Sequence, residues 1–152
     1  MVSGKLSHEL EVNAPAGDVW AVFDGLKVAK LIEENLTQII QKVDVLQGDG
    51  GVGTIVCLKF VPALGYSDSK EKITKIDHEN RIKETEVVEG GYLALGFISY
   101  RYRVQIVEKG KDSSIIKSNV EYEANDENVA KHATVEPVQN VAVLVQKHVT
   151  KA

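Results

Sequence analysis

The sequence has few of the residues that mark disulfide-linked or metal-binding proteins. Among its 152 residues are one cysteine, one methionine, one tryptophan, three prolines and four histidines. Cys57 alone can form no internal disulfide, which favours a reducing compartment, so we expect a cytoplasmic protein. The histidines at positions 8, 78, 132 and 148 lack metal-ligand spacing, and no CxxC pair or Ser-His-Asp order is present. We therefore expect no metal site.

Long apolar runs and an excess of basic charge are also absent. No segment approaches the ~18 consecutive apolar residues of a membrane-spanning helix, and the N-terminal residues lack the apolar core of a signal peptide. The net charge is −4, with lysine and arginine spread along the chain, so neither nucleic acid nor a membrane is an expected partner. The length predicts one domain over residues 1–152, which we expect to be a monomer or weak homodimer.

Glycine is concentrated in one run, Gly48-Asp49-Gly50-Gly51-Val52-Gly53. A glycine-rich loop that binds phosphate normally opens a helix, whose free N–H groups then face the anion. Here the β-branched and apolar residues at 39–46 and 54–60 predict a strand on each side. We therefore predict a tight hairpin with glycines at positive φ, and not a nucleotide site.

The first forty residues predict a strand followed by two short helices. Residues 6–12 alternate loosely between apolar and polar side chains, as an edge or hairpin strand does. Asn13 is a candidate N-cap for a first helix that contains Pro15 near its start and ends at Gly25. The spacing of apolar residues from Val28 to Leu36 predicts a second helix, too short to be stable without tertiary contacts.

The rest of the chain predicts an antiparallel sheet and a final helix. Residues 39–122 alternate with period two between turn signals, which indicates about six antiparallel strands. The final segment predicts a long helix, capped by Asn125 or Asp126 and kinked or interrupted at Pro137. A curved sheet wrapped around this helix gives an α+β fold, and its concave face can leave an internal cavity.

The clearest strand is predicted from Tyr92 to Glu108. Apolar and aromatic side chains share one face of it, and polar side chains share the other. We expect the first face, with Ile98, Tyr100, Tyr102, Val104 and Ile106, to point toward the interior. Basic and aromatic residues lie on opposite faces, which argues against a nucleic-acid stacking platform.

Two charged residues are predicted on the concave side. Glu84 and Glu86 make the better solvent face of their strand, so Lys83 shares the inner face with Thr85 and Val87. In the preceding strand Glu71 shares a face with Ile73. Two interpretations stay open. Lys83 and Glu71 form a partly solvated ion pair at the sheet edge, or they are polar groups in a ligand pocket that can perform acid–base steps.

We expect the pocket to be lined by apolar and aromatic side chains from the sheet and the final helix, together with a few hydroxyl groups. The final helix contributes one stripe at helical spacing. The candidate ligand-binding residues are Leu58, Phe60, Tyr66, Ser69, Ile73, Thr85, Tyr92, Ile98, Tyr100, Tyr102, Val138, Val141, Ala142 and Val145.

Four segments together resemble a known family. These are Gly48–Thr54, Lys70-Glu71-Lys72, Arg81-Ile82-Lys83 and Val88–Leu93. They are similar to the plant pathogenesis-related class 10 (Bet v 1-like) family, and within it to the branch of norcoclaurine and norbelladine synthases. The resemblance implies a seven-stranded antiparallel sheet, two short helices in a V and a long C-terminal helix around an apolar cavity. It implies no cofactor.

The resemblance also implies roles for particular residues. Norcoclaurine synthase condenses dopamine with an aldehyde in a Pictet–Spengler reaction, and norbelladine synthase condenses tyramine with one. Glu71 matches the catalytic glutamate, the base of the reaction, and Lys83 matches the lysine that binds the aldehyde oxygen. Ser69 stands where the family has a catalytic tyrosine, and Tyr102 stands where it has an aspartate that holds the amine.

Three functions follow from the sequence as hypotheses. In the first, the protein holds a small aromatic or amphipathic plant metabolite without changing it. In the second, Glu71 and Lys83 catalyse an amine–aldehyde condensation, although the replaced tyrosine and aspartate weigh against faithful norcoclaurine synthesis. In the third, the protein binds a plant hormone such as a cytokinin or abscisic acid.

Overall fold

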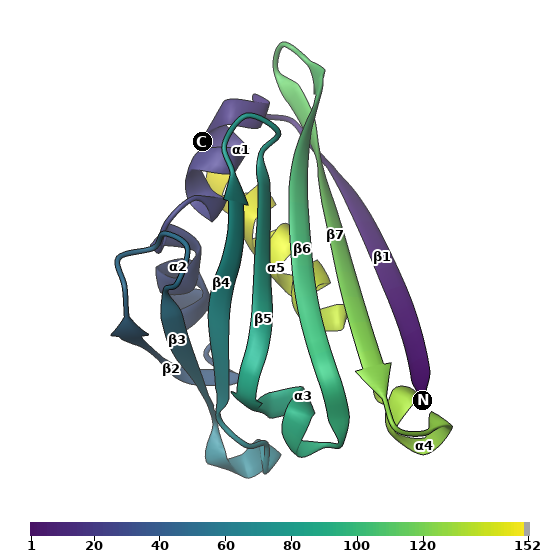
Figure 1. The fold of residues 1–152 in the computed structure, drawn as a ribbon. Helices are drawn as coiled ribbons and strands as arrows, with labels where there is room; N and C mark the ends of the chain where they lie inside the picture. The colour runs from purple at the N-terminus through teal and green to yellow at the C-terminus, as the bar shows by residue number, and fades with distance from the viewer. Residues whose placement is uncertain (151–152) are drawn as a thin grey trace.

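A curved antiparallel sheet of seven strands wraps around a long C-terminal helix in the computed structural model, which describes residues 1–150 (Figure 1). The strand order is β1-β7-β6-β5-β4-β3-β2, so β1 and β2 are the two edges. The strands are β1 (Val2–Val12), β2 (Ile40–Gln47), β3 (Ile55–Phe60), β4 (Ser69–Asp77), β5 (Ile82–Gly90), β6 (Phe97–Gly110) and β7 (Ser113–Ala124). The predicted α+β fold class is confirmed.

The helices lie mainly on the concave side of the sheet. They are α1 (Ala16–Phe23), α2 (Lys27–Asn35), α3 (Gly91–Ala94), α4 (Glu127–Ala130) and α5 (Glu136–Val149), with a 3-10 turn at Pro62–Leu64. Figure 1 shows α5 crossing behind the sheet toward α1, and α1 and α2 both contact it. Within residues 1–150, no helix is long and apolar enough to cross a membrane.

The start of α1 differs from the prediction. The helix begins at Ala16 directly after Pro15, and no side chain caps it, so Asn13 is not an N-cap. Proline at the entry to a helix is favourable because its missing N–H has no partner there in any case. The predicted end is confirmed, since α1 stops at Phe23 and Gly25 follows with φ +86°.

The final helix also differs from the prediction. Asp126 caps only the short helix α4, accepting a hydrogen bond from the Val129 N–H. The long helix α5 starts at Glu136, which places Pro137 in its first turn. Proline there removes no helical hydrogen bond, so α5 is not kinked at Pro137. The alternative prediction, an interruption, is confirmed, because the helical segment is broken between Ala130 and Glu136, just before Pro137.

The predicted strand at 92–108 is wrong in its first residues. Gly90 and Gly91 adopt positive φ, α3 follows at Gly91–Ala94, and β6 begins only at Phe97. A bulge between Phe97 and Ser99 then changes the alternation. Phe97 is consequently buried, while Ile98 is 45% exposed and cannot line the concave face. From Tyr100 onward the predicted alternation is confirmed.

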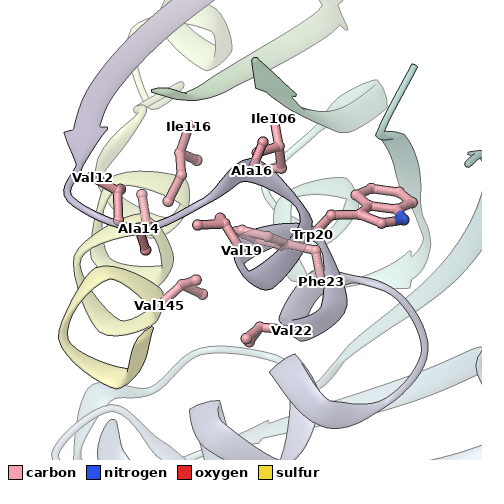
Figure 2. Close-up of a cluster of buried hydrophobic side chains, with 11 residues drawn as sticks. Val12, Ala14, Ala16, Val19, Trp20, Val22, Phe23, Ile106, Ile116 and Val145 are labelled. Atoms are coloured by element: carbon pink, nitrogen blue, oxygen red, sulfur yellow. The ribbon is translucent and has the colours of Figure 1, made fainter. Parts of the chain in front are cut away.

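Two buried clusters fill the space between the sheet and the helices. The first, which we call the α1–α5 core, combines Val19, Val22 and Phe23 of α1 with Ala142 and Val145 of α5 and with inward residues of the sheet (Figure 2). The second, the aromatic cluster, lies toward the other end of the concave face and contains Tyr92, Phe97, Tyr100, Tyr102 and Tyr122. The candidate site lies between them.

Candidate active site

The register of the sheet brings the inner residues of neighbouring strands into rows. Thr85 of β5 is opposite Ile73 of β4 and Tyr102 of β6. Lys83 is opposite Ile76 and Val104 in the next row. Because directly opposed residues of antiparallel strands share a face, these side chains all point to the concave side. The predicted inward direction of Lys83 is confirmed, since it is only 7% exposed.

The amine of Lys83 is bound by the end of α1. Its Nζ donates hydrogen bonds to the carbonyl oxygens of Phe23 at 2.7 Å and Gly25 at 3.1 Å. Carbonyls at a helix C-terminus lack helical partners and carry partial negative charge, so they favour a cation. Burial nevertheless lowers the pKa of Lys83 to about 8, while the nearby Asp24 carboxylate opposes this shift. The amine is therefore able to exchange a proton near neutral pH.

Glu71 is a partly buried carboxyl that has one side-chain hydrogen-bond partner in the part of the chain that the structure describes. The hydroxyl of Ser69, a buried residue, donates a hydrogen bond to its Oε2 at 3.0 Å. Burial raises the pKa of Glu71 to about 7, and the bond from Ser69 opposes that shift. Since a carboxyl normally titrates near 4.5, Glu71 can act as either acid or base at neutral pH.

Lys83 and Glu71 do not pair with each other. Glu71 is opposite Val87. Lys83 lies four residues before Val87 in β5, so about 13 Å of strand separates the positions of Lys83 and Glu71. Neither side chain forms an ion pair with any residue between 1 and 150. The ion-pair interpretation is wrong, and Lys83 and Glu71 stand apart on the concave face.

The aromatic cluster borders Glu71. The rings of Tyr92 and Tyr100 are stacked with centroids 3.8 Å apart, and Tyr102 meets Tyr100 edge-on at 5.5 Å. The Tyr100 hydroxyl donates to the Thr134 carbonyl at 3.2 Å, which fixes this wall to the segment before α5. Burial raises the pKa of Tyr102 well above its usual value, and the charge of Glu71 adds to the effect.

The other predicted lining residues fall into four groups. Leu58, Phe60, Thr85, Val138 and Val141 are partly buried, whereas Ser69, Ile73, Ala142 and Val145 are buried, the last two within the α1–α5 core. Tyr66 is 60% exposed and packs edge-on against Phe60, so it lies at the rim. Ile98 points away from the concave face, as described above.

Two inward residues, Phe97 and His8, were not predicted from the sequence, and Phe97 was hidden by the bulge. Tyr122, which alternation places on the inner face of its strand, is accommodated because the facing residue, Gly4, has no side chain. His8 lies on the inner face of β1, and its Nδ1 is buried without a hydrogen-bond partner among residues 1–150. His8 alternates in step with Leu6 and Leu10, and this pattern could have placed it on the inner face of the strand.

Two surface hollows lie away from Lys83 and Glu71. One, of about 530 Å³, is next to Glu86 and Arg101 on the outer side of the sheet. The other, of about 370 Å³, lies between α2 and α5 near Leu36 and Leu144. The internal cavity stays a prediction. Over the described part of the chain, no cluster of three or more His, Cys, Asp or Glu side chains could hold a metal ion.

A curved sheet around a long helix, with an amine and a carboxyl on its inner face, defines a helix-grip protein with acid–base groups facing inward. Residues 1–152 match the model of the pathogenesis-related protein Bet v 1 family, and the chain belongs to this family. The resemblance inferred from the glycine-rich run and the Lys83 segment is thereby confirmed.

Relatives of this chain include a norbelladine synthase and norcoclaurine synthases. It is 47% identical to norbelladine synthase of Narcissus pseudonarcissus, over 97% of this chain and 92% of that protein. It is 36% identical to S-norcoclaurine synthase 2 of Papaver somniferum, over 99% of this chain and 67% of that protein. The solved structure of norcoclaurine synthase from Thalictrum flavum in complex with dopamine and hydroxybenzaldehyde superimposes with a TM-score of 0.88 at 38% identity, covering 99% and 90% of the chains.

Proposed function

We propose that this protein binds an aromatic amine and an aldehyde on its concave face and condenses them to an imine. The observation that carries this proposal is the pair Lys83 and Glu71, two inward groups without ion-pair partners whose pKa values are shifted to about 8 and about 7. Burying such groups costs stability, so their presence in this state favours a chemical role.

The roles follow from the charges available at neutral pH. Protonated Lys83 donates a hydrogen bond to the aldehyde oxygen, which makes the carbonyl carbon more electrophilic. The amine nitrogen attacks that carbon, and after proton transfers the oxygen leaves as water, so that a C=N bond replaces C=O. Ionised Glu71 accepts a proton from the aromatic hydroxyl or from the amine. Each such step is worth about 10²–10⁴ in rate.

Tyr102 bears on which product forms. It lies between the rows of Lys83 and Glu71, where an aspartate in the resembling enzymes holds the amine. A buried phenol whose pKa is raised stays neutral and can only hydrogen-bond. The site therefore has less charge to stabilise a cationic amine through ring closure. This supports condensation to the imine as the main reaction and Pictet–Spengler cyclisation as a minor one.

The comparisons support the same substrates. The 47% identical relative is a norbelladine synthase, and the similar solved structure contains dopamine and hydroxybenzaldehyde. The stacked Tyr92 and Tyr100 rings offer a flat apolar wall to an aromatic ring.

The test is a condensation assay with tyramine or dopamine and either 3,4-dihydroxybenzaldehyde or 4-hydroxyphenylacetaldehyde. Borohydride trapping of the imine and chromatography of cyclised product separate the two outcomes. We expect imine to form faster than in buffer, and the rate to fall in Lys83→Ala and Glu71→Gln. Equal rates in buffer, wild type and both variants would exclude the condensation.

Carriage of an aromatic metabolite is the second candidate function. The aromatic cluster alone favours it, since apolar walls with a few polar groups are enough to hold a ligand. Displacement of a fluorescent apolar probe by flavonoids or hormones, together with no condensation in the assay above, would establish carriage in place of catalysis.

A further inference from the structure

The glycine-rich run at Gly48–Gly53 has no part in the site described so far. It forms the hairpin between β2 and β3, as predicted, with Gly48, Gly50 and Gly53 at positive φ. Gly50 is buried, and its N–H donates a hydrogen bond to the hydroxyl of Thr54 at 2.9 Å. Thr54 is itself only 1% exposed. The tip of this hairpin is therefore packed against the protein and fixed from within.

Gly50 rests on the turn that binds Lys83. A Cβ atom at position 50 would lie 2.8 Å from the Cα of Gly25 and 3.0 Å from its carbonyl carbon. That carbonyl is one of the two acceptors of the lysine amine. Contacts this short do not occur between unstrained atoms. The loop and the turn thus fit together only because position 50 is glycine.

We propose that the glycine-rich loop is a positioning element for Lys83. It supports the Phe23–Gly25 turn by its contact with Gly25, so that the two carbonyl oxygens stay within hydrogen-bond distance of the amine. The value of this placement for catalysis rests on the function proposed above. The placement itself is independent of any reaction, and can be measured on the amine.

The charged groups around the amine are few. Asp24 lies between the two acceptor residues and its carboxylate favours the protonated lysine. His78, in the turn between β4 and β5, lies 3.5 Å from Asp24 through its Nδ1. Asp49, in the loop, accepts a hydrogen bond from the Gly51 N–H. Glu71 is two rows away along the sheet.

The chain provides a matched pair of variants. Gly50 and Gly53 both have positive φ, +107° and +96°, so alanine strains the backbone at both. A Cβ at Gly53 would have no neighbour within 4 Å, whereas one at Gly50 would press on Gly25. Gly53→Ala therefore controls for backbone strain in the loop, and Gly50→Ala adds displacement of the turn.

The experiment is competitive acetylation of the intact folded protein with a trace of acetic anhydride, read by mass spectrometry across pH values on either side of 8. The exposed Lys75 is the internal reference. We expect Lys83 to react about tenfold faster at neutral pH in Gly50→Ala, the effect of losing one charge-assisted hydrogen bond. The pH at which Lys83 titrates should fall, because the weakened hydrogen bonds to the carbonyls then offset less of the effect of burial on its pKa. Gly53→Ala should match wild type.

If Lys83 reacts at the same rate in Gly50→Ala and Gly53→Ala, whether or not that rate differs from wild type, the proposal is overturned. If Gly50→Ala does not fold, Thr54→Val takes its place, because it removes the acceptor of the Gly50 N–H, and Thr54→Ser is its control. Faster acetylation of Lys83 in Thr54→Val but not in Thr54→Ser supports the proposal. Equal acetylation rates of Lys83 in the two variants refute it. If the wild type shows no condensation activity, the labelling result still decides the positioning question, so the two proposals fail separately.

Discussion

Lys83 and Glu71 both lie on the concave face, but the fold gives them different surroundings. Lys83 borders the α1–α5 core, where two backbone carbonyls bind its amine. Glu71 borders the aromatic cluster, where within residues 1–150 the Ser69 hydroxyl is its only side-chain partner. Backbone acceptors at a helix end compensate a buried cation well, whereas aromatic rings offer a carboxylate almost nothing. The lysine is thus positioned by the scaffold, and the carboxyl is kept close to its neutral form.

Replacing the lysine tests the larger effect. We expect Lys83→Met to lower the condensation rate at least about 100-fold, because Lys83 is the one lysine or arginine among the buried residues of the described part of the chain. The free energy of unfolding should change by less than about 2 kcal/mol, since lost hydrogen bonds are offset by removal of a buried charge. Lys75→Met, at an exposed position of β4, is the control. A loss of several kcal/mol in urea unfolding would show that Lys83 serves the structure instead.

Replacing the carboxyl of Glu71 tests its surroundings through the pH dependence of the free energy of unfolding. The pKa of Glu71 is raised from 4.5 to about 7 on folding, so ionisation at higher pH opposes the folded state. Its favourable contribution is complete below 4.5 and is lost as pH rises through 7. We expect Glu71→Gln to raise the free energy of unfolding at about pH 8 by ~2 kcal/mol and to converge with wild type in acid.

Urea titrations of wild type and Glu71→Gln at several pH values would measure this difference. Glu86→Gln on the outer face of β5 should show no such dependence. A constant difference between Glu71→Gln and wild type at all pH values would mean that Glu71 is already ionised and hydrated.

The aromatic cluster should depend modestly on one hydroxyl. Tyr100→Phe removes the hydrogen bonds between that hydroxyl and the backbone of Thr134 while leaving the stacked ring in place. We expect a loss of about 1 kcal/mol in the free energy of unfolding. Tyr66→Phe, at the exposed rim, should have no effect on thermal unfolding. If Tyr100→Phe and Tyr66→Phe change the free energy of unfolding equally, the hydroxyl of Tyr100 contributes no more to stability than that of the exposed Tyr66.

The smallest expected effect concerns Ser69. Its bond to Glu71 lowers the carboxyl pKa, so Ser69→Ala should move the acid side of the pH–rate profile to higher pH. The rate at high pH should stay near that of wild type, because Glu71 is ionised in both. Ser7→Ala, at an exposed position of β1, is the control. A shift toward lower pH would contradict the assigned direction of this hydrogen bond.

Alternation was sufficient to place Lys83, Thr85 and Val87 on the inner face, because their strand is regular over those residues. It failed at Ile98, where a bulge inserts one residue and reverses every side chain before it. It also failed to separate α3 from β6, since local composition favoured a strand throughout. Proline rules were ambiguous at Pro137, because the same residue can break a helix or begin one.

The sequence by itself determined the order of the strands and of the helices α1, α2 and α5, the hairpin at the glycine-rich run and the inward direction of Lys83 and Glu71. These depend on periodicity and on the conformational range of each residue, which are local properties. Only the tertiary structure decided that Lys83 and Glu71 stand apart, and that the end of α1 binds the amine. Partners distant in the chain are chosen by packing, because burial and hydrogen bonding depend on which surfaces the fold brings together.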